Sequence, residues 1–221
     1  MQRMNFRHFL APRFFLFLVS LGFLAGCSKA YYETMETFGL EKRDLLVDRV
    51  EDARDAQDDA SEQFTDALEQ FRATVNFDGG DLEKTYDRLN REYERSVDEA
   101  DEVRGRIDDV ESVANDLFRE WEGEIEDYSS AQLKAESQSM LRDTRGRYQE
   151  LMTAMRRAEA TMDPVLESFQ DQVLVLKHNL NARAIGALKG ELASIERDTE
   201  RLVAEMQQSI AEADAFIASM K

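Results

Sequence analysis

Residues 82–121 read LEKTYDRLNREYERSVDEADEVRGRIDDVESVANDLFREW, and this stretch decides the fold. Apolar and small residues recur along it at strictly alternating intervals of four and three positions. They are Leu82, Tyr86, Leu89, Tyr93, Ser96, Ala100, Val103, Ile107, Val110, Ala114, Leu117 and Trp121. Such spacing keeps one stripe of side chains on one side of a helix, where it packs along a neighbour. The stretch therefore predicts a long helix with one buried side, in which Trp121 is a core anchor.

The same spacing recurs along most of the chain and predicts three further helices. The four predicted helices are residues 33–75, 82–128, 131–178 and 183–220. The stripe of the first is Leu46, Val50, Ala53, Gln57, Ala60, Phe64, Ala67 and Phe71. Helices of similar length joined by short turns pack antiparallel to one another. We therefore expect an all-α fold, an elongated antiparallel helical bundle or coiled coil of about four long helices, with residues 33–221 as one bundle domain.

Short polar breaks separate the predicted helices. Asp78-Gly79-Gly80-Asp81 offers glycines for a turn and an aspartate to cap the next helix. Ser129-Ser130 can cap the third helix, whose stripe begins with Leu133, Ser137 and Met140. Pro164 interrupts that helix, but the stripe continues beyond it. We therefore predict a kink in one long helix, with a fresh start capped by Asp163 as the alternative.

The N-terminal 26 residues are typical of an export signal. Arg3, Arg7 and Arg13 precede an uncharged apolar run at residues 14–23. Ten residues are too few to cross a bilayer, whose core needs about 20 in a helix. A basic start followed by a short apolar run predicts a cleaved signal peptide at residues 1–26.

The end of this signal predicts a lipid anchor. Leu24-Ala25-Gly26-Cys27 resembles the bacterial lipobox, in which the cysteine sulfur receives a diacylglycerol and becomes the first residue of the mature protein. We therefore expect lipidation of Cys27, with residues 27–32 as a tether to the bundle. Ser28 follows the cysteine where lipoproteins retained at the inner membrane carry Asp. The expected location is the envelope of a Gram-negative bacterium, on the outer membrane facing the periplasm.

Charge is distributed unequally along the chain. The whole chain has 46 acidic and 28 basic residues, a net charge of -18. Residues 27–128 hold 32 of the acidic residues but only 13 of the basic ones. So acidic a protein repels nucleic acid, whose binding depends on Lys and Arg displacing counterions from phosphates. We therefore expect no nucleic-acid partner.

The first predicted hairpin carries nearly all of this excess, and its dense acidic runs have two interpretations. A solvated face that keeps the bundle soluble is the simpler one. The other is a docking surface for a basic protein partner. The candidate partner-binding residues are Asp55, Asp58, Asp59 and Glu62. The membrane, reached through the lipid on Cys27, is the other expected partner, and a homo-oligomer is a further alternative.

The sequence contains few residues of the types that act in catalysis or bind metals and cofactors. Cys27 is the sole cysteine, and His178 is the sole histidine after the signal. A di-metal site in a helical bundle needs paired glutamates and Glu-x-x-His motifs, which one histidine cannot supply. The glycine-rich loop that binds nucleotide phosphates is also missing from the sequence. We therefore expect no catalytic residue, no metal, no cofactor and no enzymatic activity.

Two segments point to a family. Residues 31–44, YYETMETFGLEKRD, with residues 176–182, LKHNLNA, resemble an uncharacterised family of proteobacterial envelope lipoproteins, classed as domain-of-unknown-function family 2959. The resemblance covers the chain from about Tyr31 to Lys221. It implies a helical lipoprotein, and it brings no activity and no catalytic residue.

These patterns together predict a non-enzymatic scaffold, spacer or adaptor in the cell envelope. The first alternative is an accessory or regulatory subunit of a periplasmic enzyme or transporter, docked through the acidic first hairpin. An uncharacterised enzyme is the second alternative.

Overall fold

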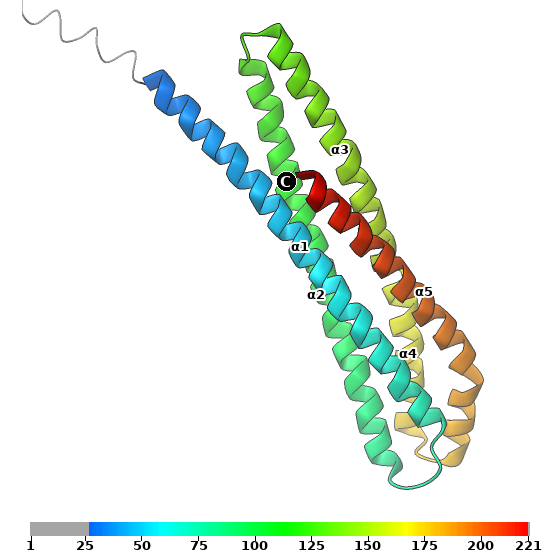
Figure 1. Cartoon of the computed structure of the whole chain (residues 1–221). Coiled ribbons are helices and arrows are strands. Elements are labelled where there is room, and N and C mark those ends of the chain that lie inside the picture. The colour runs from blue at the N-terminus through cyan, green and yellow to red at the C-terminus, as the bar shows by residue number, and fades with distance from the viewer. Residues whose placement is uncertain (1–26, 221) are drawn as a thin grey trace, which may run out of the picture. The chain divides into compact units, whose positions relative to one another are not determined.

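The computed structural model describes residues 27–220, and they are almost entirely helical (Figure 1). The helices are α1 (Cys27–Val75), α2 (Leu82–Asp127), α3 (Ala131–Ala160), α4 (Met162–His178) and α5 (Ala182–Met220). The described residues include no β-strand. The predicted all-α helical bundle is therefore confirmed, whereas the predicted signal peptide lies outside the described residues.

Two compact units divide the chain between Glu41 and Lys42. In the first unit, α1 begins at Cys27, so residues 27–32, which we predicted as a tether, are helical. The second unit, residues 42–221, contains the bundle. The bundle is described below by itself.

Each helix of the bundle packs against at least two others. α2 contacts α3 and α4, and both of these contact α5. Ion pairs join α1 to α2 through Lys42 and Glu120, and α1 to α5 through Arg72 and Glu196. α1 and α2 run antiparallel, α3 and α4 follow one another in the same direction, and α5 returns antiparallel to both (Figure 1). With α3 and α4 taken together, the bundle has the up-down-up-down arrangement expected from short turns.

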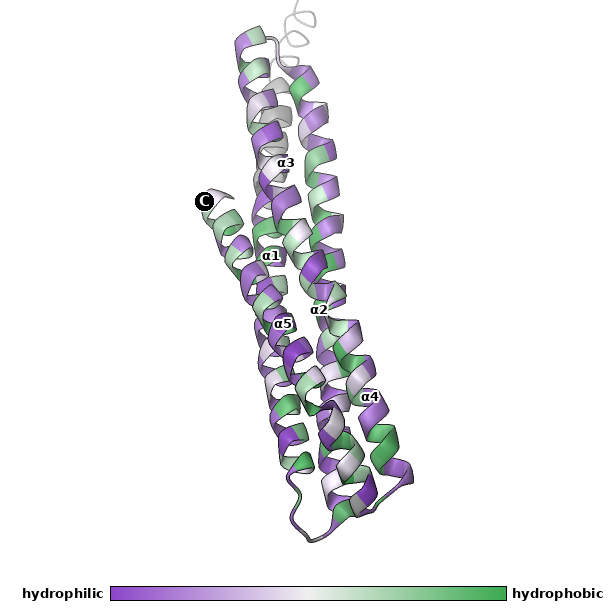
Figure 2. Ribbon diagram, turned by 90° about the vertical axis from the view of Figure 1, so that its right-hand side faces the viewer, coloured by the Kyte–Doolittle hydropathy of each residue, from purple (hydrophilic) through white to green (hydrophobic). Residues whose placement is uncertain are grey.

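The predicted stripes form the core. On α2, most stripe residues between Leu89 and Leu117 are buried, and Tyr93 is half-buried. Phe71 of α1 meets Phe169 of α4 edge to face, with 6.0 Å between ring centroids and 76° between ring planes. Figure 2 shows that apolar and polar residues alternate around each helix of the bundle. The alternation places the apolar side of each helix against its neighbours.

The turn between α1 and α2 has the predicted geometry. Gly79 and Gly80 have φ angles of 132° and 121°, a region that favours glycine. The Asp81 carboxylate accepts hydrogen bonds from the backbone N–H groups of Glu83 and Lys84, at 3.2 and 3.3 Å. The bond from Lys84 is the main reason that the pKa of Asp81 lies below its usual value. Asp81 is therefore the N-cap of α2, as predicted.

The predicted kink at Pro164 is wrong, because two helices meet at Thr161. α3 ends at Ala160 and α4 begins at Met162. The Thr161 hydroxyl and N–H both donate to the carbonyl oxygen of Ala158, at 2.6 and 3.1 Å. Pro164 lies in the first turn of α4, where a missing N–H breaks no helical hydrogen bond. The structure therefore agrees better with the alternative, a new helix that begins here. Its N-cap is Thr161 rather than the predicted Asp163.

The outer end of the α2–α3 hairpin departs from the predicted core. Leu133 and Met140 belong to the predicted stripe of α3, yet they are 50% and 58% exposed. The reason is the length of α5, whose last described residue, Met220, accepts a hydrogen bond from Arg43 near the start of the bundle part of α1. α2 and α3 continue beyond that level (Figure 1). Apolar positions on the outer part of α3 therefore lack the cover that α5 provides elsewhere.

Candidate functional site

The four acidic residues predicted to bind a partner lie together on α1. Asp55, Asp58, Asp59 and Glu62 are all exposed, whereas Ala56 and Ala60 between them are buried. Their spacing of three, four and seven positions places them on one face of the helix. We call these four residues the acidic stripe. The structure therefore brings together every residue that the sequence placed in this site.

Most carboxylates of the acidic stripe have no partner. Asp55 accepts from Arg54 at 2.7 Å, and Arg54 also bonds Asp214 of α5 at 3.1 Å. Hydrogen bonds to Asp55 and then Asp214 raise the pKa of Arg54. Within the described part of the chain, Asp58, Asp59 and Glu62 form no ion pair or hydrogen bond through their side chains. The stripe therefore presents three uncompensated negative charges to solvent.

Like charges on α2 extend this surface. Glu99 of α2 is half-buried, and its pKa is raised by burial first and then by the nearby charge of Asp59. Glu102 and Asp98 add to the same effect. Because nearby like charges disfavour ionisation, the acidic residues of α1 and α2 act on one another at Glu99. Across residues 27–220, the acidic side chains include no cluster arranged to hold a metal ion.

Acidic residues on the other side of α2 are neutralised by α3. Arg156 of α3 bonds Asp108 and Glu111 of α2, each at 2.7 Å, and Glu159 of its own helix at 2.9 Å. Partial burial works against the charge of Arg156, but hydrogen bonds to these three carboxylates raise its pKa overall. The α2–α3 face is thus internally compensated, which distinguishes it from the acidic stripe.

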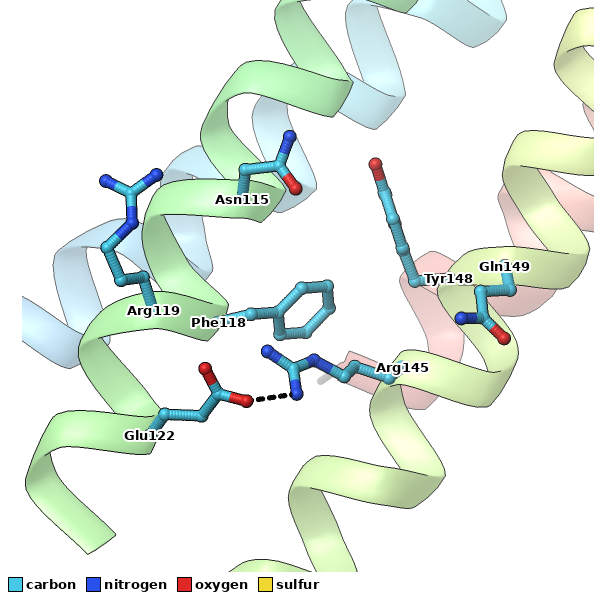
Figure 3. A pocket seen from close by; sticks show the side chains of 7 residues that line it. All are labelled: Asn115, Phe118, Arg119, Glu122, Arg145, Tyr148 and Gln149. Atoms are coloured by element: carbon cyan, nitrogen blue, oxygen red, sulfur yellow. Dashed lines mark hydrogen bonds and ion pairs between the residues drawn. The ribbon is translucent and has the colours of Figure 1, made fainter. Parts of the chain in front are cut away.

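A cleft of about 390 Å³ lies between α2 and α3, and it was not predicted from the sequence. Its lining residues are Asn115, Phe118, Arg119, Glu122, Arg145, Tyr148 and Gln149 (Figure 3). Phe118 and Tyr148 meet edge to face, with 5.3 Å between ring centroids. The Arg145 guanidinium lies 5.0 Å from the centroid of Phe118 and pairs with Glu122. This cation–π contact and ion pair hold Arg145 at the floor of the cleft.

The ionisable side chains that line the cleft are Glu122, Tyr148 and two arginines. Burial and the nearby charge of Glu111 raise the pKa of Tyr148 to about 12, so its phenol stays protonated at neutral pH. Arg119 extends away from the aromatic pair in Figure 3 and bonds Asp116 at 3.1 Å. The lining residues include no histidine, cysteine or serine that could act as a nucleophile or base. Phe118 lies on α2 but is not one of the stripe residues, which recur at alternating intervals of four and three positions. The spacing therefore did not reveal it.

His178 and Cys27 each lie at the end of a helix. His178 is the exposed last residue of α4, one residue before the turn to α5. Cys27, the predicted lipidation site, is the first residue of α1. None of the described helices combines the length and the apolar character that crossing a membrane requires.

Comparison with known proteins identifies the family and no activity. The family model described as "Protein of unknown function (DUF2959)" matches residues 31–220. No curated protein matches the chain. The match covers the bundle up to residue 220 and confirms the resemblance to domain-of-unknown-function family 2959. The chain therefore belongs to the DUF2959 family of proteins of unknown function.

Proposed function

We propose that this protein is a non-enzymatic adaptor or scaffold that binds a basic protein partner through the acidic stripe. The observation that carries the proposal is the set of exposed carboxylates of Asp58, Asp59 and Glu62, which have no partner in the described structure. Unpaired surface charges of one sign attract an oppositely charged surface and speed its association.

The construction of the bundle supports a scaffold. α2 alone has 46 residues, and at 1.5 Å per residue this corresponds to a length of about 70 Å. Buried stripes along this length keep the helices packed against one another. A stiff bundle of this kind can hold a bound partner in a defined position.

The sequence supports attachment to a membrane. Leu24-Ala25-Gly26-Cys27 matches the lipobox at all four positions. A lipid on Cys27 would anchor the chain to the outer membrane, facing the periplasm, because two or more acyl chains hold a protein stably on a bilayer. In this proposal the lipid sets the location and the acidic stripe selects the partner.

The alternative proposal is an accessory subunit of a periplasmic enzyme or transporter, docked through the same stripe. The crowding of Asp59 against Glu99 favours either partner equally, since a lysine or arginine would relieve it. The two proposals differ in the identity of the captured protein and in whether its activity changes on binding.

Cross-linking in intact cells followed by mass spectrometry tests the proposal. We expect one dominant adduct, with a protein that carries a cluster of lysines or arginines, linked near residues 55–62 on α1. Adducts spread over many abundant envelope proteins, with none enriched, would contradict it. An enzyme or transporter as the dominant adduct would favour the accessory subunit over the scaffold.

A further inference from the structure

The bundle core holds three polar side chains without a hydrogen-bond partner among the described residues: Gln57, Thr199 and Ser209. Gln57 of α1 is fully buried, and neither its amide nitrogen nor its amide oxygen has a hydrogen-bond partner among the described residues. Ser209 of α5 is also fully buried, and its hydroxyl likewise lacks a partner there. Buried polar groups that lack hydrogen bonds destabilise a fold, so each one needs an explanation.

The register of the helices places Gln57 and Ser209 at nearly the same level. Arg54 pairs with Asp214 and Arg72 with Glu196, so 18 residues separate the two pairs on each helix. This separation equals five turns, which means that α1 and α5 keep one antiparallel register between the pairs. The same register sets Gln57 opposite Ala211, two positions from Ser209.

Small neighbours surround this level. Ala53 and Ala60, the stripe residues on either side of Gln57, are fully buried, as is Ala213 beside Ser209 on α5. Small side chains leave room for a long amide to turn toward the facing helix. The two groups are also complementary, because an amide has donors and an acceptor, and a hydroxyl has one of each.

We propose that the Gln57 amide turns within this space to bond the Ser209 hydroxyl, and that the resulting polar layer fixes the register of α1 against α5. The alanines near Gln57 are small and similar, so their packing distinguishes poorly between the observed register and a register shifted by one turn. Such a shift would move the Gln57 amide away from Ser209 and toward Met206 or Ala213, which lie one turn away on α5. These side chains are apolar, so the amide would stay unpaired. A single polar core position is known to select the register of packed helices at some cost in stability.

Ion pairs on the surface are too weak for this role. Arg54 and Asp214 keep 30% and 60% of their side-chain surface exposed, and exposed pairs contribute little to stability. The polar layer also matters for the surface, because Gln57 is on the same helix as the acidic stripe and a shift of α1 would move the stripe along α5. The inference itself does not depend on the proposed function.

Cross-linking between engineered cysteines in the full chain tests the register. A Cys27→Ser background leaves the engineered pair as the only thiols. Arg54→Cys with Asp214→Cys reports the observed register, whereas Arg54→Cys with Ala218→Cys or Ile210→Cys reports a shift of one turn in either direction. A short bismaleimide links whichever pair lies close, and the circular dichroism spectrum confirms that each variant is folded.

Gln57→Met removes the amide and keeps a similar length. We expect it to raise the yield of a shifted pair about tenfold, because the shifted register no longer buries an unpaired amide. Ser209→Ala should have the same effect, and combining it with Gln57→Met should add nothing. Gln63→Met is the matched control, since the Gln63 amide bonds Glu92 in a half-buried position outside the core.

Two results would overturn the inference. In one, Gln57→Met and Ser209→Ala leave the shifted yields unchanged, which would mean that apolar packing alone fixes the register. In the other, Gln63→Met raises the shifted yields as much as Gln57→Met does, which would mean that any substitution on α1 loosens the bundle.

Discussion

Trp121 of α2 and Ser137 of α3 are joined by a hydrogen bond, in which the indole N–H donates to the hydroxyl oxygen at 2.9 Å. This bond lies on the part of the hairpin next to the exposed Leu133 and Met140. It supplies a partner for the buried hydroxyl of Ser137. The sole tryptophan thus ties the outer hairpin together.

Ser137→Ala should lower the free energy of unfolding by about 1 kcal/mol, because the hydrogen bond to Trp121 is lost. Urea denaturation followed by circular dichroism measures the change. Ser139→Ala is the matched control, since Ser139 is exposed on the same helix. Equal effects of the two substitutions would show that the Trp121 bond contributes nothing to stability.

Leu151→Ala and Leu133→Ala should differ strongly, although both remove a leucine from α3. Leu151 is 1% exposed and Leu133 is 50% exposed. We expect a loss of about 2–5 kcal/mol for the buried leucine and less than about 1 kcal/mol for the exposed one. Thermal or urea unfolding measures both. Similar losses would mean that the outer part of α3 is covered in solution.

Alanine should have opposite effects at two glycines. Gly79 has a φ angle of 132°, so Gly79→Ala forces alanine into a strained conformation, and we expect a loss of about 1 kcal/mol. Gly105 lies in α2 with open space where a Cβ would be, so Gly105→Ala should stabilise the helix by about 0.5–1 kcal/mol. Melting temperatures that move in the same direction for both variants would contradict this pair of predictions.

Glu99→Gln should stabilise the bundle at neutral pH but not in acid. The folded state raises the pKa of Glu99 above its usual value, so folding favours the protonated form. The ionised group therefore destabilises the fold at neutral pH, and this penalty disappears as the pH falls below the usual glutamate pKa. Melting temperatures at pH 7 and pH 4 measure the difference, with the exposed Glu69→Gln as control. A gain that persists undiminished at pH 4 would show that charge crowding is not its cause.

The sequence predicted what depends on local spacing. The strict stripe from Leu82 to Trp121 identified α2, and Asp78-Gly79-Gly80-Asp81 identified the turn before it, because spacing and capping are encoded within a few residues. The acidic stripe was found for the same reason, since positions three and four apart share a helix face.

Features set by distant parts of the chain were missed. The apolar pattern continues on both sides of Thr161, so spacing alone could not distinguish one kinked helix from two. Leu133 and Met140 fit the stripe of α3, and only the position at which α5 ends leaves them exposed. The cleft depends on Phe118 of α2 meeting Tyr148 of α3, a contact between residues that no local pattern relates.

Cys27→Ser should release the protein from the membrane fraction into the soluble fraction of lysed cells, because the acyl chains are the expected anchor. Fractionation with an antibody against the bundle measures this. Ser28→Ala, which leaves the cysteine in place, is the control. A Cys27→Ser protein that stays with the membrane would show that another contact holds it there.

The most direct test of the adaptor proposal is the in-cell cross-linking yield of two charge-matched variants. One carries Asp58→Asn, Asp59→Asn and Glu62→Gln. The other carries Glu150→Gln, Glu167→Gln and Asp171→Asn, which removes three exposed acidic groups from α3 and α4. We predict that the dominant adduct is lost from the first variant and kept in the second. Equal yields from both variants would contradict recognition through the acidic stripe.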